Sequence, residues 1–72
     1  MRYANYNSIK ELIRDRVSFR GNSVVAIKYS HKYEVYSYDT LILSISKDST
    51  YFNTKYYSRT TSRLQNIIKE IM

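Results

Sequence analysis

Residues 64–71, "LQNIIKEI", carry the apolar pattern that decides the fold. Apolar side chains recur there at i, i+3, i+4 and i+7, which is the spacing of one face of an α-helix. The apolar positions are Leu64, Ile67, Ile68 and Ile71. Thr60 or Thr61 is the natural N-cap, because a hydroxyl there can accept a bond from a free N–H group of the first turn. The segment predicts an amphipathic C-terminal helix that packs its apolar stripe against a core.

A second, shorter helix is predicted over residues 8–16. Ser8 and Glu11 fit a capping box, in which a hydroxyl and a carboxylate satisfy the first free N–H groups of a helix. Apolar residues then follow at helical spacing, at Ile9, Leu12 and Ile13. The chain therefore has one apolar helical stripe near each end.

The segment between the two helices alternates apolar and polar side chains, which is typical of β-strands. The expected strands cover residues 17–20, 23–30, 33–38, 40–46 and 51–57. Gly21 and Asn22 predict a two-residue hairpin turn, and Asp39 predicts a turn or a bulge. In the strand at 40–46, the alternation places Leu43 on one face and Ile42 on the other.

These elements predict a single α+β domain over residues 1–72. We expect a small antiparallel sheet of three to five strands, flanked by an N-terminal and a C-terminal helix. Both helices would cover one face of the sheet, because their apolar stripes are then buried together. The other face would present tyrosine, lysine, glutamate and serine side chains to water or to a partner.

The composition limits the chemistry of the chain. It has 72 residues, no cysteine and a single histidine, His31, so we expect no disulfide, no metal site and no cofactor. No run of apolar residues is long enough for a membrane span, so we expect no membrane partner. Small domains without disulfides or a structural metal often gain stability by association, so we expect a homodimer.

Catalysis is not expected either. The lone histidine lies in a predicted turn, the six carboxylates are scattered, and there is no glycine-rich phosphate loop. The sequence therefore favours a binding protein over an enzyme.

The charge favours an acidic partner. Twelve Lys and Arg stand against six Asp and Glu, which gives a net charge of +6. The candidate partner-binding residues are basic or tyrosine side chains expected at the surface: Lys28, Lys32, Tyr36, Tyr38, Lys55, Tyr56, Arg59 and Arg63. Two kinds of partner fit them. An acidic protein would use Tyr and Arg as anchors, whereas nucleic acid would place phosphates on the cations and stack bases on the tyrosines.

Residues 57–63, "YSRTTSR", permit two interpretations. Free N–H groups, hydroxyls and two arginines at a helix start can hold an anion. Serine and threonine are also common helix caps, and we favour this structural interpretation for most of the segment. Whether Arg59 and Arg63 face a partner or water stays open.

Two stretches in the second half of the chain resemble a group of small bacteriophage proteins. They are "SYDTLI", residues 37–42, and "YFNTKYYSRTTSRLQNII", residues 51–68. The group is marked by a Ser-Tyr-x-Thr strand segment and a C-terminal Tyr-Ser-x-Thr-Thr-Ser-x-x-Gln-Asn signature. The matching signature residues here are Tyr57, Ser58, Thr60, Thr61, Ser62, Gln65 and Asn66.

The resemblance implies a phage origin and a place of action in the cytoplasm of the infected bacterial host. Small early phage proteins commonly bind and disable a host enzyme, and a staphylococcal phage protein of similar size inhibits the host replication sliding clamp. The resemblance therefore implies a host-takeover inhibitor of DNA replication. The candidate target is the sliding clamp, whose loading onto DNA a bound dimer would block.

Overall fold

The structure is a computed structural model that describes residues 2–71. Its elements follow the order β1 (Arg2–Tyr3), α1 (Tyr6–Arg14), β2 (Phe19–Arg20), β3 (Val24–Lys28), β4 (Lys32–Ser37), β5 (Thr40–Ser46), β6 (Thr50–Phe52) and α2 (Arg59–Ile71). The predicted α+β fold, with a helix near each end and an antiparallel sheet between them, is confirmed.

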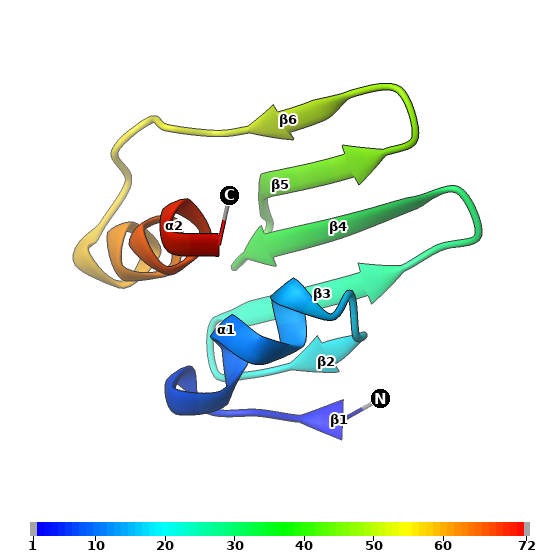
Figure 1. Cartoon of the computed structure of the whole chain (residues 1–72). Helices are drawn as coiled ribbons and strands as arrows, with labels where there is room; N and C mark the ends of the chain where they lie inside the picture. Colours follow the sequence, from blue (N-terminus) through cyan, green and yellow to red (C-terminus); the bar gives the residue numbers. More distant parts are fainter. Residues whose placement is uncertain (1, 72) are drawn as a thin grey trace.

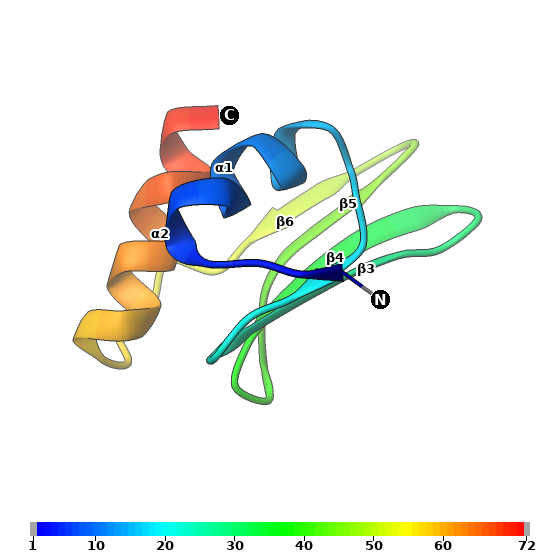
Figure 2. The same ribbon diagram turned by 90° about the horizontal axis from the view of Figure 1, so that it is seen from below.

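The six strands form one sheet in chain order, from β1 to β6 (Figure 1). Strands β2 to β6 are antiparallel neighbours, whereas β1 pairs with β2 in parallel because α1 forms the crossover between them. Both helices lie over the same face of the sheet, and no helix formed by residues 2–71 covers the other face (Figure 2). The sequence did not predict β1, because two residues are too few to show an alternating pattern.

The core fills the space between the sheet and the two helices. One row of side chains crosses the sheet in register, at Phe19, Ala26, Val35 and Leu43, and all four are fully buried. The helices meet this layer with the buried side chains Ile9 and Ile13 of α1 and Leu64 and Ile68 of α2. The apolar stripes of the two helices are thus buried together, as predicted.

A bulge changes the strand pattern that the sequence suggests. The register between β4 and β5 shifts between Val35 and Tyr36, so that Val35 pairs with Leu43 and Tyr36 pairs with Leu41. Ile42 is the extra residue, and it is fully buried together with Leu43. The prediction that Ile42 and Leu43 lie on opposite faces was wrong, because an inserted residue resets the alternation of side chains.

Both helices begin earlier than predicted. The N-cap of α1 is Asn5, whose Oδ1 accepts a bond from the Asn7 N–H at 3.0 Å, so the prediction of Ser8 was wrong. Helix α2 begins at Arg59, and the Oγ of Ser58 accepts a bond from the Thr61 N–H at 3.2 Å. Asparagine and serine are as effective at the N-cap position as the serine and threonine residues that were predicted. The tertiary fold therefore decides which of the neighbouring polar residues becomes the cap.

Gly21 lies where two segments approach closely. A Cβ atom at this position would lie 2.8 Å from Cγ1 of Val24 and 3.0 Å from the carbonyl oxygen of Ala4. Its backbone N–H donates to the carbonyl of Val24 at 2.7 Å, which closes the hairpin between β2 and β3. Gly21 therefore serves the packing of the N-terminal segment against this hairpin.

Candidate functional site

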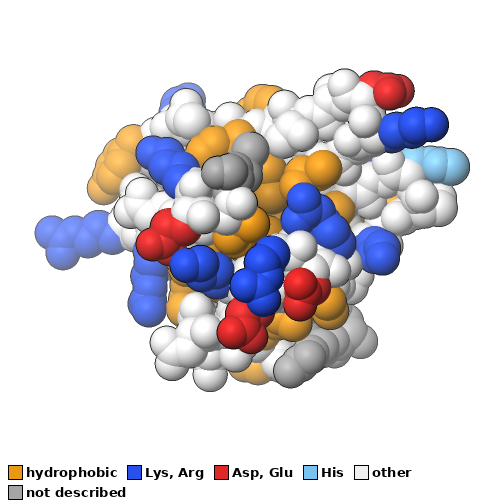
Figure 3. All heavy atoms as spheres, viewed as in Figure 1, with side chains coloured by type: hydrophobic (Ala, Val, Ile, Leu, Met, Phe, Trp, Pro, Cys, Tyr) orange, Lys and Arg blue, Asp and Glu red, His pale blue; other side chains and the backbone are white. Residues whose placement is uncertain are grey.

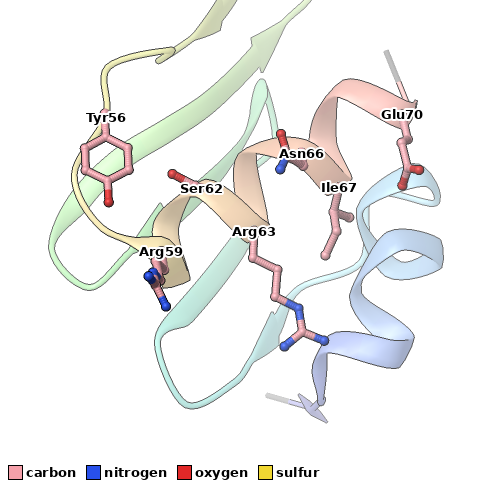
Figure 4. Close-up of a pocket in the computed structure, with 7 residues that line it drawn as sticks. All are labelled: Tyr56, Arg59, Ser62, Arg63, Asn66, Ile67 and Glu70. Carbon is pink, nitrogen blue, oxygen red and sulfur yellow. The ribbon is translucent and has the colours of Figure 1, made fainter.

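A groove runs along the outer face of α2, with a volume of about 570 Å³. We call it the α2 groove, and Figure 4 shows its lining residues: Tyr56, Arg59, Ser62, Arg63, Asn66, Ile67 and Glu70. Six of them occupy one face of α2, at the helical spacing that also defines its buried stripe. Tyr56 joins them from the coil before the helix. The helix therefore presents two guanidinium groups, a hydroxyl and an amide side by side.

The first turn of α2 is fixed to the sheet by a buried hydroxyl pair. The side chains of Thr61 and Ser37 share a hydrogen bond of 2.8 Å, and both residues are buried. Ser37 is the last residue of β4, so this bond ties the start of the helix to the end of a central strand. It fixes the position of the turn that carries Arg59 and Arg63.

The coil between β6 and α2 is held by two buried amide side chains. Gln65 donates from Nε2 to the backbone carbonyls of Asn53 at 2.7 Å and Lys55 at 3.0 Å. Asn53 donates from Nδ2 to the carbonyl of Leu41 at 3.2 Å and to the Tyr57 hydroxyl at 2.9 Å. Hydrogen bonds therefore hold this coil at Asn53 and Lys55 before Tyr56 and at Tyr57 after it, and the ring of Tyr56 is exposed between them.

The charges in the groove are unevenly distributed. The guanidinium of Arg63 lies 4.6 Å from the ring centroid of Tyr6, and Arg59 is exposed. Among residues 3–71, no carboxylate lies within 4.0 Å of either guanidinium. At the far end, the Glu70 carboxylate faces Lys10 of α1 at 3.6 Å. The end of the groove nearest the start of α2 therefore carries two cations without an ion-pair partner among these residues.

Five of the predicted site residues gather at this end of the molecule. Tyr56, Arg59 and Arg63 line the groove, and Lys55 lies in the same coil with its ammonium 5.7 Å from the Tyr57 ring centroid. Tyr38 is exposed in the turn after Ser37, beside the first turn of α2, and it adopts a left-handed backbone with φ of 55°.

The other three predicted site residues lie elsewhere. Lys28 and Lys32 flank the turn between β3 and β4, at the opposite end of the sheet. Tyr36 lies on the uncovered face, where its hydroxyl donates to Glu34 Oε1 at 2.9 Å, and this hydrogen bond raises the pKa of Tyr36. Glu34 also pairs with Lys32 at 3.2 Å. The eight candidates therefore form no single surface.

Sequence reasoning missed Ser62, Asn66, Ile67 and Glu70 as groove residues. The signal was present, because these positions follow Arg59 and Arg63 at the spacing of the same helix face. The groove offers hydrogen-bond donors, positive charge and a tyrosine ring, which suit binding. Within residues 2–71, no three His, Asp or Glu side chains come together as metal ligands.

Two further features of the whole chain bear on function. Across residues 2–71, neither α1 nor α2 has the length and apolar character that crossing a membrane requires. Figure 3 shows Lys and Arg side chains at the edge where α2 begins, across the middle of the face among Asp and Glu side chains, and at the opposite edge near the two hairpin turns.

Comparison with known proteins gives one match. A family model described as a family of unknown function, DUF8033, matches residues 7–70. No curated protein and no solved structure matches the chain. The matched residues include both helices almost completely and all the strands from β2 to β6.

Proposed function

We propose that this chain, which belongs to the DUF8033 family of unknown function, is a non-catalytic protein that binds an acidic segment of a partner protein in the α2 groove. The observation that supports this best is the pair Arg59 and Arg63, one helical turn apart, with no carboxylate within ion-pair distance among residues 3–71. A partner that supplies carboxylates would complete this surface.

The side chains of the groove suit this role. Arginine presents a planar set of N–H donors that matches a carboxylate in two parallel hydrogen bonds. Tyrosine and arginine are enriched among the residues that dominate the energy of protein interfaces, and Tyr56 stands beside the two arginines. The net charge of +6 would also accelerate encounters with an acidic protein.

The bond network behind the groove supports binding with little rearrangement. The Thr61–Ser37 pair and the amide bonds of Gln65 hold the helix start and the coil in place before any partner arrives. Less conformational freedom is then lost on association, which favours affinity.

The resemblance to small phage proteins makes the bacterial replication clamp the first partner to test. On this proposal the chain acts as a homodimer in the cytoplasm of an infected bacterium and prevents loading of the clamp onto DNA. Association would also add buried surface to a domain of only 72 residues.

The test compares two variants that change the net charge equally. Arg59→Glu/Arg63→Glu alters the groove, whereas Arg14→Glu/Arg20→Glu alters two exposed arginines outside it. The variants are titrated against the purified clamp, and each is used to capture partners from a bacterial lysate.

We expect the groove variant to lose about thirtyfold or more in affinity, since even one anchor residue is worth about 2 kcal/mol or more. We expect the control variant to keep its affinity within a few-fold. Capture of a different acidic protein, lost only in the groove variant, would reject the clamp and retain the groove. Equal losses in both variants would reject the groove as the binding surface.

A further inference from the structure

A second basic hollow lies at the end of the sheet opposite the α2 groove. It has a volume of about 240 Å³, and its lining comes from Arg16, from the turn between β3 and β4, and from the end of β5 with Lys47. The turn between β3 and β4 and the turn between β5 and β6 lie at the same end of the sheet (Figure 1). We call this hollow the hairpin pocket. Its lining includes four cations, at Arg16, Lys28, Lys32 and Lys47, together with His31, and among residues 3–71 it includes no carboxylate. The hairpin pocket and the α2 groove share no lining residue.

Arg16 is held in one position at the edge of the pocket. It follows α1 in a left-handed conformation with φ of 58°, and its Nη1 donates to the carbonyls of Ile13 at 2.7 Å and Arg14 at 3.3 Å. Its guanidinium lies 5.9 Å from the ring centroid of Tyr33. These bonds use only Nη1, so the Nε–H and Nη2–H groups are the donors that can serve a ligand.

The three lysines come from different elements. Lys28 ends β3, Lys32 begins β4, and Lys47 follows β5. The Lys32 ammonium lies 5.1 Å from the ring centroid of Tyr29, an exposed residue that also lines the pocket. Lys28 and Lys32 flank one hairpin turn, and the fold brings Lys47, which is distant in the sequence, to the same pocket.

Three carboxylates lie close to this region in the chain, and none of them lines the pocket. Asp15 is exposed beside Arg16, and its Oδ1 lies 3.6 Å from Nε of Arg14. Glu34 is buried and already accepts from the Tyr36 hydroxyl and pairs with Lys32. Asp48 is exposed in the turn next to Lys47. Of the four cations, only Lys32 has an ion-pair partner among residues 3–71, so an anion of high charge density would be attracted to the hairpin pocket.

We propose that the hairpin pocket binds the phosphate backbone of single-stranded nucleic acid. Lysine ammonium groups bind phosphate as point charges, and the fixed arginine can donate to phosphate oxygens. An exposed tyrosine beside such cations offers a stacking surface that accepts any base. The hollow lies on the surface at the tips of two hairpins, so a chain can enter and leave it.

The test measures the anisotropy of a labelled single-stranded oligonucleotide of mixed sequence over a series of salt concentrations. Lys28→Gln/Lys47→Gln removes two charges from the pocket. Lys10→Gln/Arg20→Gln removes the same charge from exposed residues outside it. Far-UV circular dichroism and the unfolding midpoint of each variant show whether it keeps the fold.

Each phosphate contact contributes about 0.7 to the slope of log K against log salt for a single strand. We therefore expect the pocket variant to bind with a slope shallower by about 1.4, and the control variant to keep the wild-type slope. Equal slopes in both variants would overturn the proposal, because the oligonucleotide would then respond only to the net charge of the protein and not to the pocket. No binding by the wild-type protein at low salt would overturn it too.

Two further arms test the single-stranded ligand. Tyr29→Leu should weaken binding about fivefold without changing the salt slope, because stacking is worth about 1 kcal/mol or more per base and releases no counterions. The same oligonucleotide as a duplex should bind more weakly than the single strand. Unchanged affinity in Tyr29→Leu, or tighter binding of the duplex, would contradict the proposal. Partner binding in the α2 groove is measured separately, with different variants.

Discussion

The hydroxyl of Thr61, in the polar segment before the C-terminal helical stripe, makes a hydrogen bond in the interior of the protein. Thr61 is 2% exposed and Ser37 is 1% exposed, and their side chains bond to each other at 2.8 Å. A buried hydroxyl without a partner costs free energy, because the bond to water that it gave up is not replaced. The pair therefore ties α2 to β4 and stabilises the fold directly.

Thr61→Val tests this pair. The valine keeps the shape of the side chain and leaves the Ser37 hydroxyl without this partner, so we expect the free energy of unfolding to fall by about 1–3 kcal/mol. Urea unfolding measures the change. Ser37→Ala/Thr61→Val removes both hydroxyls, and we expect the double variant to lose less than the sum of the single losses. Additive losses would show that the two hydroxyls do not act as a pair.

The Tyr33 phenol makes the stability of the fold sensitive to alkaline pH. Burial raises its pKa above the usual value of 10.0, and the Arg16 guanidinium offsets part of this shift. The phenol donates to the carbonyl of Val17 at 2.8 Å, which requires its proton. The folded protein therefore keeps this proton at a pH where the unfolded chain loses it.

The sign of the effect follows from proton binding. The stability from this group is fully present below about pH 10, and it falls by about 1.4 kcal/mol per pH unit above that. Urea unfolding between about pH 8 and about pH 11 measures the slope. In Tyr33→Phe this contribution is absent, so the difference in stability between the two proteins should shrink as pH rises. A difference independent of pH would contradict the assignment.

At the scale of elements, the position of α2 depends on the coil before it. The Gln65 side chain donates to two backbone carbonyls of that coil, at Asn53 and Lys55, and Tyr56 follows directly. The helix, the coil and the α2 groove therefore behave as one unit. A change inside the molecule at Gln65 should alter the surface at Tyr56.

Gln65→Met tests this connection. Methionine fills a similar volume without donating, so we expect a loss of about 1–3 kcal/mol in the free energy of unfolding. Hydrogen exchange should become faster in the coil over residues 53–58, and partner binding in the groove should weaken. Asn66→Met is the control for hydrogen exchange alone, since Asn66 is exposed on the same helix, makes no side-chain hydrogen bond among residues 3–71 and itself lines the α2 groove. Equal exchange in both variants would show that Gln65 does not hold the coil.

The elements also show what the sequence can predict. The helical stripes that contain Ile13 and Ile68 identify α1 and α2, because a 3.6-residue period is a local property. The bulge at Ile42 was not predicted, since it depends on the pairing of β5 with β4. The caps were missed because several neighbouring polar residues can serve, and tertiary packing chooses among them.

The candidate site was also predicted only in part, because the sequence identified some groove residues but did not show which candidates lie together. Arg59 and Arg63 were both predicted as site residues, but the N-cap predicted at Thr60 or Thr61 placed Arg59 before the helix, whereas α2 begins at Arg59 and carries both on one face. Lys28 and Lys32 were grouped with them by charge, but they lie at the other end of the sheet. The register of the strands and the direction of α2 decide that separation, and neither is visible in the composition.

At the scale of the whole molecule, two basic surfaces lie at opposite ends of a body about 30 × 26 × 22 Å in size. The α2 groove combines arginine, tyrosine and amide groups along a helix, whereas the hairpin pocket concentrates lysines around a fixed arginine. The first suits the carboxylates of a protein segment and the second suits phosphates. The two ends therefore permit independent binding of two kinds of acidic partner.

Calorimetric titration of the purified bacterial replication clamp with three proteins tests the central claim most directly. The proteins are the wild type, Arg59→Glu/Arg63→Glu and the charge-matched Arg14→Glu/Arg20→Glu. We expect the control to bind within a few-fold of the wild type, and the groove variant to lose about thirtyfold or more in affinity. Equal binding by all three proteins would contradict the α2 groove as the interface, and no binding by the wild type would contradict the clamp as the partner.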